Sequence, residues 1–275
     1  MHRTEPKVAT RKRQTRLDKT YEILNRKGSV AVEMLPQNRV TIIGKTGSGK
    51  SAFGIVYAGL WAMALRPPWE VWWLDTKDDM DDIYKLRQWG FRNAFSSKDL
   101  KTTLIPWAKY FLIRPTATAN IIEIADAIIK MAYERKNVII VVDEFAQIRY
   151  SSQTMTRSML NVYQRGRSRN VGIVSLVQEP VFNPRQLVSQ ATQVYFFNLT
   201  MTADIEYVQK YFKDYIPPNK MGDRFGFWLL DVDNTGEVIY YSSQQDWYLT
   251  SEFHLPVPIP QPDSELIESQ PSSRQ

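Results

Sequence analysis

Short, almost continuous runs of apolar residues alternate along the chain with longer stretches in which apolar residues recur every three or four positions. The runs are rich in β-branched residues and are typical of strands buried on both faces, whereas the longer stretches are typical of helices packed on one side. The runs predict strands at residues 40–43, 71–74, 110–113, 138–142, 172–177 and 193–199. The periodic stretches predict helices at residues 51–65, 80–89, 119–135 and 155–164. This alternation predicts an α/β fold, with a mostly parallel central sheet covered by helices.

The ends of the chain depart from this pattern. Residues 225–231 and 237–241 flank the turn sequence Asp-Asn-Thr-Gly, which predicts a C-terminal β-hairpin. Residues 29–35 alternate weakly and predict a short edge strand, and the proline-rich end of the chain predicts an extended tail. We therefore expect three parts: an N-terminal arm at residues 1–27, one domain at residues 28–250 and a tail at residues 251–275.

Positive charge is concentrated in the N-terminal arm. Residues 1–27 hold nine Lys or Arg and three acidic residues, a balance of +6 that equals the net charge of the whole chain. A basic arm on a neutral body attracts polyanions such as nucleic acid or an anionic membrane surface, although a solvated tail is the alternative. No run of the sequence approaches the ~18 apolar residues of a membrane span. Without cysteine and with only two histidines, disulfides, thiolate zinc sites and a Cys/His dyad are excluded, and a reducing cytosol suits the chain.

The residues between the first predicted strand and the first predicted helix match the phosphate-loop pattern G-x-x-x-x-G-K-S in full. They are Gly44, Lys45, Thr46, Gly47, Ser48, Gly49, Lys50 and Ser51. In such a loop, backbone N–H groups and the N-terminus of the following helix surround a phosphate group. We expect Lys50 to reach the β- and γ-phosphates of ATP, and the Ser51 hydroxyl to hold Mg²⁺. A plain glycine-rich turn is the alternative.

The predicted strand at residues 138–142 runs directly into two acidic residues, Asp143 and Glu144. We expect Asp143 to complete the Mg²⁺ shell and Glu144 to act as the general base that activates the attacking water. The alternative is that the two acids only cap the segment that follows. Together with the phosphate loop, the pair predicts an ATP hydrolase that uses Mg²⁺.

Three closely spaced arginines precede the strand at residues 172–177, and a glutamine follows it. Arg165, Arg167 and Arg169 repel one another unless an anionic group is close, although an exposed basic turn is the alternative. Gln178 stands at the carboxyl end of its strand, where ligands bind in open α/β sheets. It can contact a γ-phosphate or orient the attacking water, unless it is a polar residue without function.

In this order, the motifs resemble those of the HerA/FtsK group of DNA-pumping ATPases, which includes genome-packaging ATPases of membrane-containing icosahedral viruses. The resemblance covers about residues 38–215. Besides the phosphate loop and the acidic pair, it rests on Asp75-Thr76-Lys77, on the arginines before Gln178 and on Asp204-Ile205-Glu206-Tyr207-Val208. It implies a three-layer P-loop NTPase fold of the RecA-like (ASCE) type.

The resemblance also implies a homo-oligomeric ring, a pentamer or hexamer, in which an arginine of one subunit enters the nucleotide site of its neighbour. By position Arg169 matches this finger best, with Arg167 and Arg165 as alternatives. The implied function is translocation of double-stranded DNA into a preformed viral capsid, with a capsid or portal-vertex protein as a further partner. The expected location is the cytoplasm of a host cell, or a virion vertex. A conjugation or DNA-repair translocase and a nucleotide-switched assembly or secretion ATPase are the alternatives.

Overall fold

The computed structural model describes residues 37–64, 68–77, 80–94, 110–113, 120–151, 153–232 and 238–242. The predicted arm, the edge strand at residues 29–35 and the proline-rich tail therefore lie outside the described residues. The turn of the predicted hairpin lies outside them as well. No helix within the described ranges is long and apolar enough to span a membrane.

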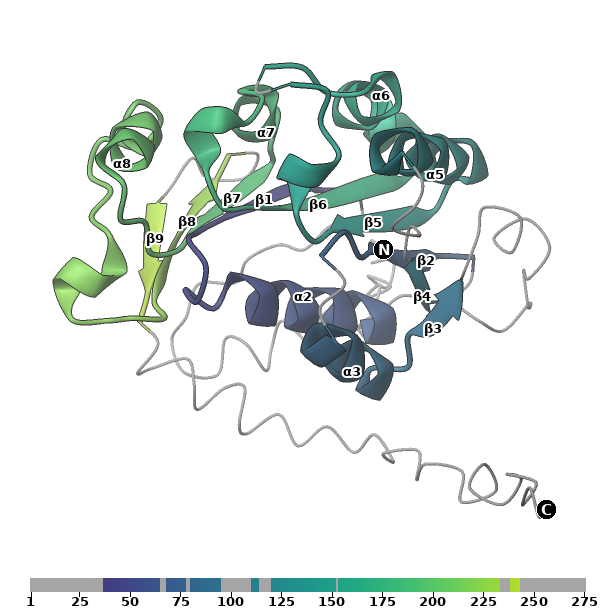
Figure 1. The fold of residues 1–275 in the computed structure, drawn as a ribbon, viewed down its shortest axis with the longest axis horizontal. Coiled ribbons are helices and arrows are strands. Elements are labelled where there is room, and N and C mark those ends of the chain that lie inside the picture. The colour runs from purple at the N-terminus through teal and green to yellow at the C-terminus, as the bar shows by residue number, and fades with distance from the viewer. Residues whose placement is uncertain are drawn as a thin grey trace, which may run out of the picture.

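The strands of the described residues form one nine-stranded sheet in the order β3-β4-β2-β5-β6-β1-β7-β8-β9 (Figure 1). The first seven in this order pair in parallel and are β3 (Arg92–Ala94), β4 (Tyr110–Ile113), β2 (Glu70–Leu74), β5 (Val138–Val142), β6 (Val171–Val177), β1 (Arg39–Ile43) and β7 (Gln193–Phe196). The predicted hairpin is β8 (Phe227–Asp231) and β9 (Val238–Tyr241), and it extends the same sheet through antiparallel pairing with β7.

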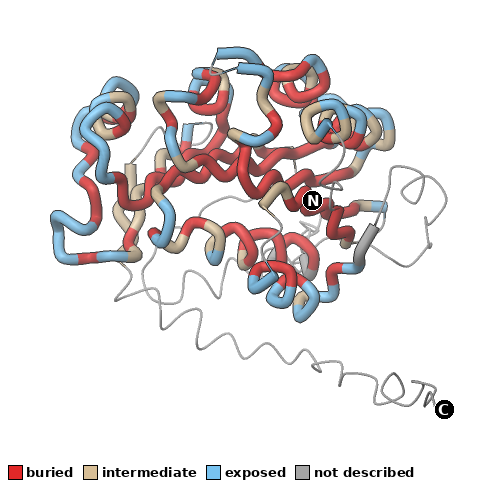
Figure 2. The backbone as a smooth tube through the Cα atoms, in the orientation of Figure 1, coloured by how far each residue is buried: buried red, intermediate tan, exposed pale blue. Residues whose placement is uncertain are grey.

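Helices cover both faces of the sheet and give the fold three layers (Figure 1). One face carries α2 (Lys50–Ala64) and α3 (Met80–Gln88). The other carries α5 (Ile121–Arg135), α6 (Arg157–Arg165), α7 (Gln186–Ser189) and α8 (Thr202–Gln209). Four short 3₁₀ helices complete the described elements: η1 (Phe145–Gln147), η2 (Gly166–Arg169), η3 (Pro180–Phe182) and η4 (Pro218–Met221). Strands β1, β2, β4, β5, β6 and β7 are buried almost throughout (Figure 2), whereas the hairpin strands are mostly half-buried. Each face of the sheet has its own apolar core.

The fold confirms the predicted α/β class, with local differences, and β7 ends at Phe196 and not at residue 199. Strand β3 was not expected, because Arg92, Asn93 and Ala94 contain no apolar run, and only pairing with β4 makes them a strand. Helix α6 begins two residues later than its periodicity predicts, because the Thr156 hydroxyl caps it by accepting a hydrogen bond from the Met159 amide at 3.4 Å.

The strand order brings the phosphate loop, the Asp143–Glu144 pair and Gln178 to one edge of the sheet. Strand β6 lies between β1 and β5, with Val177 opposite Ile43 and Ser175 opposite Val142. Because these three strands are parallel, the segments that follow their carboxyl ends are neighbours in space.

Candidate nucleotide site

The phosphate loop, residues 44–51, follows β1 directly and passes into α2. Gly47 and Gly49 have φ angles of 73° and 94°, a left-handed conformation that favours glycine. Gly44 has no room for a side chain, because an added Cβ would lie 2.6 Å from Cβ of Phe197. The backbone of this loop therefore requires its glycines, as a phosphate-binding loop between a strand and a helix does.

The Lys50 side chain is buried, with an exposed fraction of only 3% for the residue. Burial, followed by the nearby charge of Lys77, lowers the pKa of Lys50 to about 8. The carboxylates of Glu144 and Asp143 act in the opposite direction. Lys50 is thus a buried cation whose charged form a bound anion would favour.

Asp143 and Glu144 follow β5 and are both buried. Glu144 occupies the position before η1, yet its side chain makes no capping hydrogen bond, which counts against a mere capping role. Among the described residues, Oδ2 of Asp143 and Oε1 of Glu144 have no hydrogen-bond partner. Burial raises the pKa of Glu144, against the opposing charges of Lys50 and Lys77. The acidic pair therefore presents two buried carboxylate oxygens that are available to a ligand or to a proton.

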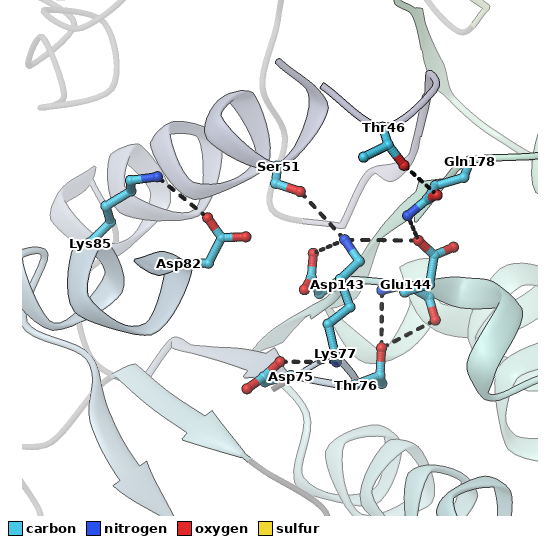
Figure 3. A network of polar contacts seen from close by, with 10 residues as sticks. All are labelled: Thr46, Ser51, Asp75, Thr76, Lys77, Asp82, Lys85, Asp143, Glu144 and Gln178. Atoms are coloured by element: carbon cyan, nitrogen blue, oxygen red, sulfur yellow. Dashed lines mark hydrogen bonds and ion pairs between the residues drawn. The ribbon is translucent and has the colours of Figure 1, made fainter. Parts of the chain in front are cut away.

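Gln178 connects the acidic pair to the phosphate loop (Figure 3). Its amide nitrogen donates a short hydrogen bond to Oε2 of Glu144, and its carbonyl oxygen accepts one from the Thr46 hydroxyl at 2.9 Å. The predicted placement at the carboxyl end of β6 is thus confirmed. The amide fixes the orientation of the Glu144 carboxylate and leaves Oε1 as its unpartnered oxygen.

The segment after β2 supplies two site residues to which the sequence gave no role. The Thr76 hydroxyl accepts from the amide of Glu144 at 3.2 Å and donates to its carbonyl at 3.3 Å. Nζ of Lys77 lies 3.1 Å from Oδ1 of Asp143, 3.4 Å from Oγ of Ser51 and 3.8 Å from Oε2 of Glu144 (Figure 3). In the sequence, the only sign of a role for Thr76 and Lys77 is that they are polar and closely follow a buried strand. The pairing of β2 with β5 shows what these two residues contact.

The segment before β8 also borders the phosphate loop, and sequence reasoning missed it. A Cβ on Gly47 would lie 3.9 Å from Nη2 of Arg224, and one on Gly49 would lie 3.4 Å from Cδ1 of Phe225. Asp223 fixes the segment, because its Oδ1 accepts a hydrogen bond from the Phe225 amide at 3.2 Å. Since β8 is antiparallel to β7, it begins at the edge where the parallel strands end. An exposed arginine therefore lies beside the loop of its own chain.

The arginine turn, residues 165–169, lies at the opposite edge of the sheet. The turn precedes β6, whereas Gln178 follows β6. The seven residues of this strand therefore separate the turn from Gln178 by roughly 20 Å. Arg167 and Arg169 are exposed. The guanidinium of Arg169 lies 5.3 Å from the centre of the Tyr133 ring. The structure does not bring these arginines to the phosphate loop of their own chain.

The residues predicted to bind Mg²⁺ suit that ion. The Ser51 hydroxyl and the Asp143 carboxylate share one cationic neighbour, the Lys77 ammonium group. Hydroxyl and carboxylate oxygens are the ligands that Mg²⁺ prefers, usually completed by water and substrate phosphates. Oδ2 of Asp143 is a buried oxygen without a partner among the described residues. Within the same residues, no group of three or more His, Cys, Asp or Glu side chains could hold a metal ion.

The sheet, the loop and the acidic pair give this chain the fold of the P-loop NTPases. No family model matches the sequence, and no curated protein matches it. Among solved structures, the chain is similar to the genome packaging NTPase B204 from Sulfolobus turreted icosahedral virus 2. The complex of B204 with AMPPCP has 16% sequence identity and a TM-score of 0.56, over 76% of this chain and 99% of that chain. For the complex with ATP-gammaS the TM-score is 0.58, at 16% identity and over 76% and 98% of the two chains. At this identity the likeness shows a shared fold, that of a P-loop NTPase.

Proposed function

We propose that this chain is a Mg²⁺-dependent ATP hydrolase and a subunit of an oligomeric motor that translocates double-stranded DNA, packaging a viral genome into a preformed capsid. One observation carries the catalytic part: the phosphate loop, Asp143, Glu144 and Gln178 meet at one edge of the sheet. The similarity to a fold that has been solved with ATP analogues supports this assignment. We assign the activity to the domain at residues 28–250.

ATP binding follows from the loop and its lysine. The loop amides and the N-terminus of α2 attract the phosphates, and Lys50 supplies the side-chain cation. The lowered pKa of Lys50 reflects a buried charge, and phosphate oxygens beside the ammonium group would compensate that charge. Ser51 and Asp143 would hold Mg²⁺, which neutralises phosphate charge in this class of reaction.

Hydrolysis requires a base beside the phosphates, and Glu144 has the features of one. Its Oε2 accepts from Gln178, so the carboxylate has one orientation, and its buried Oε1 has no partner among the described residues. Burial raises its pKa, which makes its carboxylate a stronger base than an exposed one. We assign Oε1 to the proton of the attacking water.

The position of the arginine turn supports a shared site in a ring. Arg167 and Arg169 lie at the edge of the sheet opposite their own phosphate loop, so they act in catalysis only on a neighbouring subunit. A contact of one edge with the opposite edge of the next subunit is head-to-tail, and such contacts generate a ring where the rotation between subunits closes. Arg169 stacks on Tyr133, whereas the exposed Arg167 side chain forms no hydrogen bond, ion pair or ring contact with the described residues. We therefore propose Arg167 as the finger, with Arg169 as the alternative.

The DNA part of the proposal rests on charge and on the likeness to a packaging enzyme. The arm at residues 1–27 holds the whole net charge of the chain, which suits the phosphate backbone of duplex DNA. B204 is described as a DNA-packaging ATPase from a turreted icosahedral virus. A capsid or portal-vertex protein is the further partner that genome packaging requires.

The proposal is tested by ATP turnover with and without duplex DNA, combined with mass measurement of the ATP-bound assembly. We expect Mg²⁺-dependent turnover, stimulation by duplex DNA and a mass of five or six chains. The Lys50→Ala variant is the matched control, and it should show none of the turnover. Turnover that duplex DNA leaves unchanged would contradict the motor, and no turnover under any condition would contradict the enzyme.

A further inference from the structure

Hydrogen bonds of the segment that contains Lys77 fix its position in the proposed nucleotide site. Its amide donates to Oδ1 of Asp75 at 3.2 Å, and the preceding Thr76 is bonded twice to the backbone of Glu144. Strand β2 pairs in parallel with β5, with Leu74 opposite Val142, so both segments leave the same edge of the sheet. The side chain of Lys77 is only 21% exposed. Lys77 is therefore half-buried and held in place by its backbone contacts, unlike an exposed surface lysine.

The Lys77 ammonium group contacts the two side chains assigned to the metal. Nζ donates to Oδ1 of Asp143 at 3.1 Å and to Oγ of Ser51 at 3.4 Å, and these groups come from three different segments (Figure 3). The Asp143 side chain is 1% exposed, and a buried carboxylate without a counter-charge is strongly destabilising. In this structure Lys77 supplies that counter-charge.

The ammonium group and a metal ion exclude each other at this position. A metal ion held by Ser51 and Asp143 would lie beside the Lys77 ammonium group, which already bonds to one oxygen atom of each side chain. Two cations that share these ligands repel each other, and more strongly where water is largely excluded. A metal ion alone must therefore displace Lys77, whereas a nucleotide adds phosphate oxygens as further ligands and negative charge that offsets the repulsion.

We propose that Lys77 is an internal counter-ion of the metal site, which competes with free divalent metal so that the metal binds effectively only together with the nucleotide. This deepens the proposed function, since it rests on Ser51 and Asp143 as metal ligands. Lys77 is then a positioning residue. Its ammonium group holds Ser51 and Asp143 together in the structure described, and it is released when the metal–nucleotide complex binds.

The competition is measured directly with Mn²⁺, whose unbound fraction is visible by electron paramagnetic resonance, in the complete absence of nucleotide. Lys77→Met should bind Mn²⁺ at least ~10-fold more tightly than the wild type, because the metal no longer displaces a charge-assisted hydrogen bond. Adding Asp143→Asn to Lys77→Met should abolish this gain. Equal Mn²⁺ affinity of the wild type and Lys77→Met would overturn the proposal.

Lys85→Met is the matched control, because it removes a nearby lysine that pairs with a different acid. Nζ of Lys85 lies 3.6 Å from Oδ1 of Asp82, and its side chain is 51% exposed. Its Mn²⁺ affinity should equal that of the wild type. A gain equal to that of Lys77→Met would show a general charge effect and would also overturn the proposal.

A second measurement uses the unmodified protein and does not depend on the folding of a variant. An amine-acylating reagent, read by mass spectrometry, should label Lys77 several-fold faster when Mn²⁺ alone saturates the site, with Lys85 unchanged. Equal labelling of Lys77 with and without Mn²⁺ would refute the displacement. Binding of a fluorescent ATP analogue, measured on the same preparation, reports the proposed function separately, so the failure of one proposal is distinguishable from the failure of the other.

Discussion

The shared site makes a prediction about mixtures of two inactive variants. One variant, Lys50→Ala, has no functional phosphate loop, and the other, Arg167→Ala, has no finger. Within one chain the two features stand at opposite ends of β6, roughly 20 Å apart, which is beyond the reach of an arginine side chain. Arg167→Ala should therefore bind ATP normally but lose turnover by ~10³-fold or more, the range of trans-acting arginines. That loss corresponds to about 4 kcal/mol of transition-state stabilisation.

The mixture should recover activity because a head-to-tail interface combines the loop of one chain with the turn of the next. With equal amounts, about one interface in four joins an intact loop to an intact turn, since each is carried by half of the subunits. The assay is ATP turnover at several mixing ratios, with mixed assemblies confirmed by mass. We expect a maximum of up to about a quarter of wild-type turnover near the equal ratio, if the sites act independently.

Two controls sharpen this experiment. Lys130→Ala removes an exposed cation of α5 whose partner Glu134 is 3.9 Å away, and it should leave turnover unchanged, since such pairs contribute little. Repeating the mixture with Arg169→Ala decides between the two candidate fingers. No recovery at any ratio with either arginine variant, in assemblies shown to be mixed, would refute the shared site.

The remaining predictions concern single features. Lys50→Ala alone should weaken ATP binding by ~10- to 100-fold, the value of a charged hydrogen bond, and calorimetry measures this; unchanged affinity would contradict the assigned role. Glu144→Gln should bind ATP as the wild type does but lose ~10²- to 10⁴-fold in turnover, and loss of binding instead would make Glu144 structural. Gly166→Ala should destabilise the fold by ~1–3 kcal/mol in urea unfolding, because the new Cβ would lie 2.5 Å from the carbonyl oxygen of Val171; equal stability would refute the close approach. Deleting residues 1–27 should lower the salt dependence of DNA affinity, by about 0.9 in log–log slope for each DNA phosphate that the arm neutralises, and an unchanged slope would assign the arm to another partner.

The sequence alone determined the fold class and which residues form the core of the proposed nucleotide site. The sequence predicts the buried strands from their β-branched apolar runs, because a strand covered on both faces has no polar side to interrupt the run. The sequence predicts the phosphate loop because the glycine pattern reflects local backbone geometry. Gly47 and Gly49 adopt the left-handed conformation that this geometry requires. The sequence predicts Asp143 and Glu144 as site residues because they directly follow a buried apolar strand.

Strand order and strand direction decided what the sequence left open. Lys77 contacts Ser51 and Asp143 because β2 pairs with β5, and Arg224 lies beside the phosphate loop because β8 runs antiparallel to β7. The sequence places the arginine turn before β6 and Gln178 after it, and the structure adds that Gln178 contacts the phosphate loop whereas the turn lies at the far edge of the sheet. Contacts between segments distant in the chain depend on which strands pair and in which direction. That choice follows from the packing of the whole sheet and its helices, and no local pattern of residues encodes it.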